Sequence, residues 1–162
     1  IAKAPIIAIT GTNGKSTTTA MIWSCLKGAG ENPILCGNIF GSGFVEKPLT
    51  EAADEAGEDD VLVAEISSFQ LEWVQQFCPV VSVITNISQD HLNRYNSFED
   101  YAATKKRIWA RQTSDHFTIV RANDPIVGEP GKEITGVARR LRAFAGEAPP
   151  TNLPTVWKAG AT

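Results

Sequence analysis

Short apolar runs alternate with segments of helical periodicity along most of the chain. Two of the runs, residues 6–9 and 61–66, have little polar alternation, which predicts strands covered on both faces. Three further runs predict strands at residues 34–36, 80–85 and 117–120. The pattern therefore indicates at least five strands, of which two are fully buried.

The segments between these runs repeat their apolar residues at helical spacing. Four helices are predicted, at residues 16–27, 51–56, 68–76 and 97 to about 111. Gly28 ends the first helix, and the string from Ser97 to Asp100 has the S-x-x-D form of a capping box that opens the fourth. In the third, Phe69 and Trp73 stand one turn apart and predict an apolar face.

Strands that alternate with helices predict βαβ units, hence an α/β fold with a mainly parallel sheet flanked by helices. Ligands of such sheets bind at the carboxyl ends of the strands. We expect a single domain, residues 1–162, with residues 129–162 as its poorly assigned tail. Within that tail, Leu141–Phe144 fits either a strand or a helical turn. The chain starts at Ile1 and enters a strand almost at once, so we interpret it as part of a longer protein.

Composition narrows the class of protein. A content of 43% apolar residues allows a proper core, and a net charge of −3 argues against nucleic acid as a partner. The three cysteines, Cys25, Cys36 and Cys78, form no CxxC pair, so neither a disulfide framework nor a structural zinc site is expected. This cysteine pattern makes a reducing cytoplasm the expected setting. No apolar run approaches the roughly 20 residues that span a bilayer, so we expect no membrane partner.

The strongest chemical signal is the string T-G-T-N-G-K-S-T between the first strand and the first helix. A glycine loop there lets backbone N–H groups surround a phosphate, and the helix N-terminus adds partial positive charge. The general phosphate-loop pattern would place a glycine where Ile9 stands, and a plain strand-to-helix turn is the structural alternative. The string indicates a P-loop NTPase-like sheet. The candidate phosphate-binding residues are Gly11, Thr12, Asn13, Gly14, Lys15, Ser16 and Thr17.

Glu65 stands near the end of an otherwise apolar predicted strand. A carboxylate is costly to bury unless it is paired or binds a metal, and this position suits a magnesium-binding acid. The alternative is an acidic side chain that simply emerges into solvent.

Two further clusters follow the strand that ends at Thr85. The first, residues 86–95, contains His91, which could bind metal or phosphate, although a single loop histidine is more often structural. The second, residues 105–107, is a basic run on a predicted helix, and a solvated basic face explains it equally well. Residues Tyr101 and Lys105 share one face of that helix.

These strings resemble the Mur ligases and the folylpolyglutamate synthases, in which the short phosphate loop T-G-T-N-G-K-[ST] is usual. Four more strings, in the same order along the chain, resemble the Mur ligases that add D-glutamate. The most discriminating is S-S-F-Q-L-E, which ends at Glu72. The four matching strings are Gly37–Ile39, Glu65–Glu72, Asp90–Tyr95 and Tyr101–Lys105.

The resemblance implies a role for each polar side chain of the phosphate site. Lys15 would hold the phosphates of ATP, while Ser16 and Glu65 would bind one Mg²⁺ ion. His91 would bind a second Mg²⁺. Lys105 matches the lysine that is carbamylated in this family, and carbamylation requires a neutral amine, so its pKa must be lowered by burial or neighbouring charge.

The resemblance also implies the substrates. Asn38 and either Ser67 or Ser68 would contact the uridine-linked muramoyl substrate. The intact enzyme would be an ADP-forming ligase that joins D-glutamate to UDP-N-acetylmuramoyl-L-alanine through an acyl phosphate, in peptidoglycan precursor synthesis. It would be a cytoplasmic monomer. The adenine-contacting H-N-x-x-N string and the two outer domains of the family are absent from these residues, so we expect the chain alone to be inactive.

Three alternatives stay open on the sequence. Another Mur-type or folylpolyglutamate-type ligase would share the loop, although S-S-F-Q-L-E favours the D-glutamate-adding branch. A nucleotide-driven switch or transport ATPase would usually carry aspartate where Glu65 stands, and no N-K-x-D string for guanine is present. Finally, the chain could be a nucleotide-binding module without activity of its own.

Overall fold

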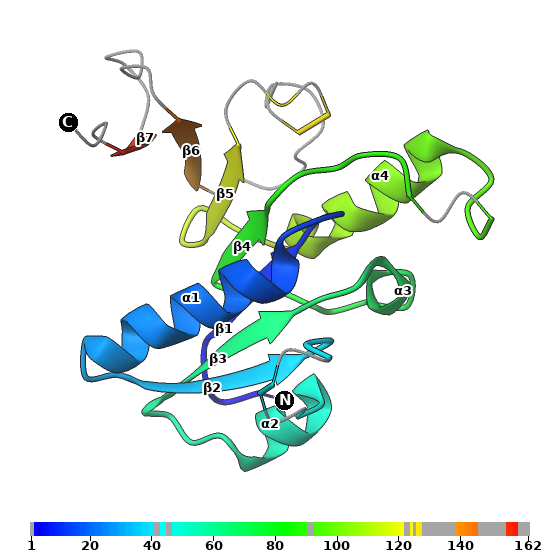
Figure 1. Ribbon diagram of the computed structural model, residues 1–162. Helices are drawn as coiled ribbons and strands as arrows, with labels where there is room; N and C mark the ends of the chain where they lie inside the picture. Colours follow the sequence, from blue (N-terminus) through cyan, green and yellow to red (C-terminus); the bar gives the residue numbers. More distant parts are fainter. Residues whose placement is uncertain are drawn as a thin grey trace.

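The structure is a computed structural model, and it shows one parallel sheet with helices on both faces (Figure 1). It describes residues 2–40, 43–44, 47–90, 93–121, 124, 126–127, 139–145 and 155–158. The strands are β1 (Ile6–Thr10), β2 (Asn32–Gly37), β3 (Asp60–Glu65), β4 (Val81–Ile84), β5 (Phe117–Arg121), β6 (Arg139–Ala145) and β7 (Thr155–Lys158). The helices are α1 (Lys15–Gly28), α2 (Leu49–Glu55), α3 (Ser68–Leu71), α4 (Phe98–Lys106) and the 3-10 helix η1 (Arg107–Trp109).

Over the described residues the sheet has seven strands in the order β2-β3-β1-β4-β5-β6-β7, and every pairing is parallel. The predicted α/β fold with a mainly parallel sheet is therefore confirmed. The segment Leu141–Phe144, for which the sequence allowed a strand or a helical turn, lies within strand β6. Strand β1 lies between β3 and β4, so the loops after these three strands meet at one edge of the sheet.

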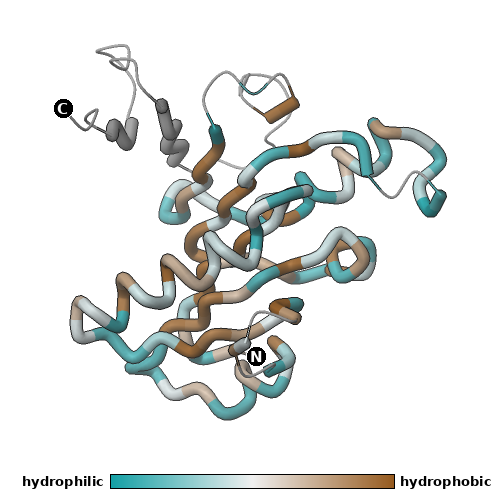
Figure 2. Tube along the Cα trace, viewed as in Figure 1, coloured by the Kyte–Doolittle hydropathy of each residue, from teal (hydrophilic) through white to brown (hydrophobic). Residues whose placement is uncertain are grey.

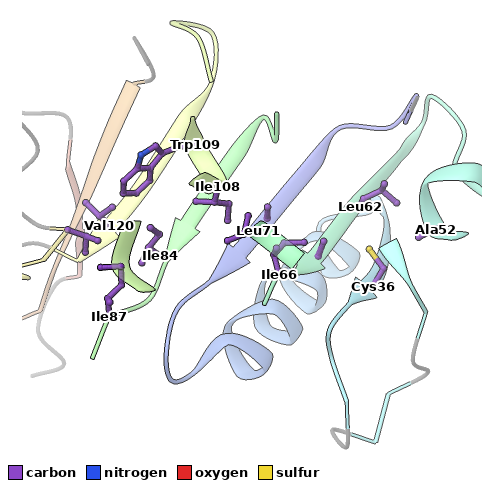
Figure 3. Packing of buried hydrophobic residues seen from close by; sticks show 14 of the residues in the cluster. Cys36, Ala52, Leu62, Ile66, Leu71, Ile84, Ile87, Ile108, Trp109 and Val120 are labelled. Carbon is purple, nitrogen blue, oxygen red and sulfur yellow. The ribbon is translucent and has the colours of Figure 1, made fainter. Parts of the chain in front are cut away.

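The two faces of the sheet pack against different helices. On one face, Ile9, Val63 and Val83 contact Ile22 and Leu26 of α1. The opposite face is covered by α2, α3, α4 and η1, and Figure 3 shows buried side chains from both the strands and these helices. The apolar residues concentrate along the central strands in Figure 2, as expected for strands covered on both sides. Among the described helices, none is both long and apolar enough to cross a bilayer.

Helix α3 is shorter than the sequence predicted. The helix expected over residues 68–76 ends at Leu71, and the two aromatic side chains expected one turn apart on it are exposed, Phe69 by 41% and Trp73 by 79%. Ser68 and Leu71 are the residues of α3 that are buried. The prediction was wrong because the chain leaves the helix after Leu71, where the carbonyls of Glu72 and Val74 accept hydrogen bonds from Arg107 of η1.

The start of α4 is confirmed, with a difference in its cap. The Ser97 hydroxyl accepts a hydrogen bond from the Asp100 N–H at 3.1 Å, which is half of the predicted capping box. Aspartate is one methylene shorter than the glutamate or glutamine that usually completes a box. A full capping box forms instead between Ser67 and Gln70, at the start of α3.

Candidate phosphate and metal site

The phosphate loop leads directly into α1 and leaves the start of that helix open to an anion. Gly14 is the N-cap residue, no side chain caps the helix, and its first turn carries no acidic residue. The first N–H groups of a helix have no partner within the helix, so here they can serve a ligand. The Lys15 ammonium group donates to the Thr12 carbonyl at 3.0 Å, which holds the lysine side chain along the loop.

Ser16 and Glu65 are brought into direct contact from different elements. Ser16 lies in the first turn of α1, and Glu65 lies at the end of β3. The Ser16 hydroxyl donates a hydrogen bond to Glu65 Oε2 at 2.6 Å. Glu65 is 2% exposed, so its carboxylate is held inside the site rather than projecting into solvent. A hydroxyl and a carboxylate at one point form the oxygen-rich environment that Mg²⁺ prefers, and the residues present fit such an ion.

Lys105 lies on the other side of the same loop. Its ammonium group donates to the Gly11 carbonyl at 2.8 Å and sits 4.8 Å from the centre of the Tyr101 ring, one turn earlier on α4. The side chain is 2% exposed. The expected sharing of one helix face by Tyr101 and Lys105 is confirmed.

The surroundings of Lys105 favour its neutral form. Burial is the main cause that lowers the pKa of the amine from 10.5 to about 8, and the positive charge of Lys15 adds to it. The carboxylates of Asp90 and Glu65 act in the opposite direction but more weakly. A substantial neutral fraction near pH 8 is what carbamylation of a lysine requires.

The predicted substrate residues lie on neighbouring loops at the same edge. The Asn38 N–H donates to the Glu65 carbonyl at 2.8 Å, so the loop after β2 is tied to the end of β3. Gly37 has φ 91°, and a Cβ there would lie 2.1 Å from the Glu65 carbonyl oxygen, so only glycine fits. Ser68 is 3% exposed, whereas Ser67 is half-buried, which favours Ser67 over Ser68 as a residue that a ligand could reach.

Not every predicted residue can be placed. His91 lies outside the described residues, as does the adjoining Leu92. Among the described residues, no group of three or more His, Cys, Asp or Glu side chains is arranged to hold a metal ion. The other histidine of the chain, His116, accepts a hydrogen bond from the Thr113 N–H at 2.9 Å in a surface turn.

A cavity of about 630 Å³ opens beside the phosphate loop. It extends from the first turn of α1 towards the aromatic residues that follow β2, so it connects the loop with the segment that carries Asn38. Its lining residues are Ser16, Thr17, Ala20, Met21, Ser24, Phe40 and Phe44.

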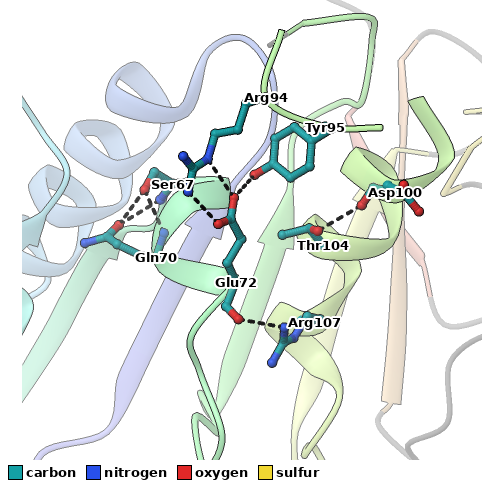
Figure 4. Close-up of polar contacts among 8 residues, drawn as sticks. All are labelled: Ser67, Gln70, Glu72, Arg94, Tyr95, Asp100, Thr104 and Arg107. Carbon is teal, nitrogen blue, oxygen red and sulfur yellow. Dashed lines mark hydrogen bonds and ion pairs between the residues drawn. The ribbon is translucent and has the colours of Figure 1, made fainter. Parts of the chain in front are cut away.

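A second group of side chains ties the end of α3 to the residues just before α4 and to η1 (Figure 4). The Glu72 carboxylate accepts two hydrogen bonds from Arg94, at 3.1 and 2.7 Å, and one from the Tyr95 hydroxyl at 2.7 Å. These bonds lower the pKa of Glu72, with Arg94 the larger cause. Arg107 donates to the carbonyls of Glu72 and Val74. It thereby supplies hydrogen-bond donors for carbonyl groups that have no helical partner beyond the end of α3.

The residues that hold the phosphate loop through hydrogen bonds were not predicted from the sequence. Thr85, Asn86 and Ser88 all bond to the loop, and the Tyr101 hydroxyl lies 3.1 Å from Thr12 Oγ1. Asn86 and Ser88 follow directly on the strand predicted at residues 80–85, and that position was the available signal, because strand ends of a parallel sheet meet at one edge.

Comparison with known proteins gives matches over most of the chain. The model of the Mur ligase middle domain matches residues 9–147. UDP-N-acetylmuramoylalanine–D-glutamate ligase from Thermoanaerobacter sp. (strain X514) is 48% identical over 124 residues, which are 76% of this chain and 26% of that protein. The ligase of the same name from Alkaliphilus metalliredigens (strain QYMF) is 40% identical over 134 residues, 83% of this chain and 28% of that protein. The chain thus spans about a quarter of the length of these curated relatives.

Solved structures share the fold at lower identity. The MurF ligase from Thermotoga maritima in complex with ADP matches with a TM-score of 0.65 and 19% identity, over 86% of this chain and 33% of that one. A UDP-N-acetylmuramoyl-L-alanyl-D-glutamate–2,6-diaminopimelate ligase matches with a TM-score of 0.62 and 20% identity, over 90% of this chain and 33% of that one. At such identities the likeness establishes the fold alone.

Proposed function

This chain belongs to the Mur ligase family, and from that membership we propose that it is the central, ATP-binding domain of a three-domain ligase. The full-length protein would add D-glutamate to UDP-N-acetylmuramoyl-L-alanine, forming ADP, in the cytoplasmic synthesis of peptidoglycan precursors. The names of the relatives at 40–48% identity support this choice of amino acid and acceptor. The observation that carries the proposal is the contact between Ser16 and Glu65 at the open end of α1.

The phosphate loop would bind the triphosphate of ATP. The N–H groups at the start of α1 supply fixed hydrogen-bond donors. The Lys15 ammonium group supplies a positive charge on a flexible side chain, which can adjust its position to the phosphates. Lys15 already lies along the loop, 3.0 Å from the Thr12 carbonyl, so it needs only a change of side-chain conformation to meet a ligand.

Two magnesium sites would adjoin the loop. Ser16 and Glu65 would hold one ion, and His91 together with a carbamate on Lys105 would hold the other. Bound Mg²⁺ would supply positive charge that offsets the repulsion between the γ-phosphate and an attacking carboxylate. Lys105 supports this assignment by its burial, its lowered pKa and its contact with the loop at Gly11.

The chemistry would then need orientation rather than a protein nucleophile. The L-alanyl carboxylate of the acceptor displaces ADP from ATP and becomes an acyl phosphate, and the amine of D-glutamate attacks that carbonyl and releases phosphate. Asn38 and Ser67 would orient the acceptor, because they stand on the loops next to Glu65. Lys15 would stabilise the negative charge that spreads over the transferred phosphoryl group.

The test is ADP formation by the full-length protein with UDP-N-acetylmuramoyl-L-alanine and D-glutamate. Lys15→Ala removes the cation that follows the phosphates and should lower kcat at least about 100-fold. Lys27→Ala, in the last turn of the same helix, is the matched control and should keep the wild-type rate. Near-normal ADP release by Lys15→Ala would overturn the assignment of the loop. Turnover with a different amino acid or acceptor only would favour another ligase of the family.

A further inference from the structure

The segment Thr85–Ser88 continues beyond β4 and runs against the phosphate loop. The Thr85 N–H donates to the Thr10 carbonyl at 3.0 Å, and the Thr12 N–H donates to the Asn86 carbonyl at 2.9 Å. The hydrogen bonding between β1 and β4 is thereby prolonged past the ends of both strands. The segment Thr85–Ser88 therefore pairs with the start of the phosphate loop through backbone hydrogen bonds.

The Asn86 side chain bonds both backbone groups of one loop residue. Its Oδ1 accepts from the Asn13 N–H at 3.1 Å, and its Nδ2 donates to the Asn13 carbonyl at 2.9 Å. Such a pairing uses the donor and the acceptor of the amide at once, and therefore fixes its orientation. The Thr85 hydroxyl adds a second donor to the Asn13 carbonyl, at 2.8 Å.

Thr12 provides a second anchor beside Asn13. Its hydroxyl accepts from the Ser88 N–H at 3.0 Å, donates to the Ser88 carbonyl at 3.2 Å, and lies 3.1 Å from the Tyr101 hydroxyl. The residue is 8% exposed. Thr12 was predicted to be one of the phosphate-binding residues of the loop, and its side chain is directed into the protein.

Gly11 allows the segment to approach this closely. Its φ is 148°, and a Cβ at this position would lie 1.9 Å from Thr85 Oγ1 and 3.1 Å from the Asn86 carbonyl oxygen. The first distance leaves no room for a side chain, and the second is tighter than an ordinary contact. The first glycine of the loop is thus required by the contact with Thr85 and Asn86, independently of any phosphate.

These contacts divide the loop into a held part and a free part. The N–H groups of Thr12 and Asn13 are already bonded to Asn86, whereas those from the start of α1 have no side-chain cap. We propose that Asn86 is a positioning residue for nucleotide binding: by holding Asn13, it aims the N–H groups of residues 14–17 at the bound phosphates. The inference rests on the proposed function, since it takes a nucleoside triphosphate as the ligand.

The test measures ATP affinity and turnover separately in the full-length protein. Asn86→Ala removes both side-chain bonds to Asn13 and should weaken ATP binding about tenfold, as expected for two lost hydrogen bonds. The kcat at saturating ATP should change less than about twofold, because positioning is recovered once the nucleotide is bound. Asn86→Asp keeps the shape and the acceptor but loses the donor and adds negative charge, so it should weaken binding at least as much. Asn96→Ala, an exposed asparagine farther along the chain, should bind ATP as the wild type does.

The readouts separate positioning from a general loss of stability. A purely structural role would lower the folded fraction and kcat together, while folded molecules would keep the wild-type Kd for ATP, measured by calorimetry. Wild-type Kd values in both Asn86 variants would overturn the inference and leave the proposed function intact. Absence of ATP binding by the wild-type protein would overturn both.

Discussion

The Lys105 ammonium group is almost completely buried, so its charge is a cost to the folded state at neutral pH. Its pKa falls from 10.5 to about 8 on folding, which means that the unfolded chain binds more protons between these two values. Stability from this residue is therefore fully present above pH 10.5, is lost as pH falls towards 8, and stays constant below.

We expect Lys105→Met to remove that dependence. The free energy of unfolding of the wild type, minus that of the variant, should rise between pH 8 and 10.5 by on the order of 3 kcal/mol, at about 1.4 kcal/mol for each pKa unit. Urea denaturation in carbonate-free buffer measures it, and other titrating groups cancel in the difference. A flat difference over this range would contradict the lowered pKa.

Gly37 offers a second prediction at the scale of one residue. Gly37→Ala should destabilise the chain by about 2–4 kcal/mol, because it combines a left-handed backbone with a clash against the Glu65 carbonyl. Gly30→Ala is the matched control, since Gly30 has nearly the same φ, 90°, but open space around it. It should cost only about 1–2 kcal/mol. Equal losses in thermal or urea unfolding would show that the clash does not matter.

Residues differed in how far their surroundings could be predicted. The resemblance to the Mur ligases implied that Ser16 and Glu65 would meet at one metal ion, and the structure places the two side chains in direct contact. The sequence did not reveal that the Thr12 hydroxyl points inward or that Asn86 holds the loop, because side-chain direction depends on contacts more than 70 residues apart. The sequence also left Ser67 and Ser68 equivalent, and only burial separates them.

At the scale of elements, a buried polar group joins the segment after η1 to β4 and β5. The side-chain amide of Gln112 accepts from the Ser82 and Thr118 hydroxyls and donates to the carbonyls of Pro79 and Phe117. Gln112 is 3% exposed, and the two hydroxyl residues are completely buried. Buried polar groups are costly once a partner is lost, so this group fixes the position of the chain between α4 and β5.

Gln112→Leu should therefore lower the free energy of unfolding by about 2–4 kcal/mol. The exposed Gln75→Leu provides the matched control and should change it by less than about 0.5 kcal/mol. Adding Ser82→Ala and Thr118→Val to Gln112→Leu should recover part of the loss, since fewer polar groups are then left unpaired. Chemical denaturation of the four proteins measures these values, and no recovery in the triple variant would argue against unpaired hydroxyls as the cause.

Elements with a strong periodic pattern were predicted well, and those whose ends depend on distant partners were not. Strands β1 and β3 and helix α1 follow directly from apolar runs and a glycine stop. The end of helix α3 was not predicted, because it depends on hydrogen bonds that Arg107 donates to the Glu72 carbonyl and Arg94 donates to the Glu72 carboxylate. No local sequence pattern predicts hydrogen bonds from arginines that are 22 and 35 residues away.

At the scale of the molecule, the candidate site is a property of the sheet edge. Loops after β1, β2, β3 and β4 meet there, and α4 closes the site through Lys105. The chain covers about a quarter of its curated relatives, so this edge would be one wall of a larger active site.

The order of the strands has a consequence for how the protein is made. The phosphate loop lies near the start of the chain, but its supports come from residues 76, 89 and 94 positions later: Ser88, Tyr101 and Lys105. A nascent chain on the ribosome therefore carries an unsupported loop until α4 has emerged, and contacts between such distant residues form late in folding. The capacity to hold a nucleotide would then appear only after α4 has been synthesised, when β5, β6 and β7 are still to come.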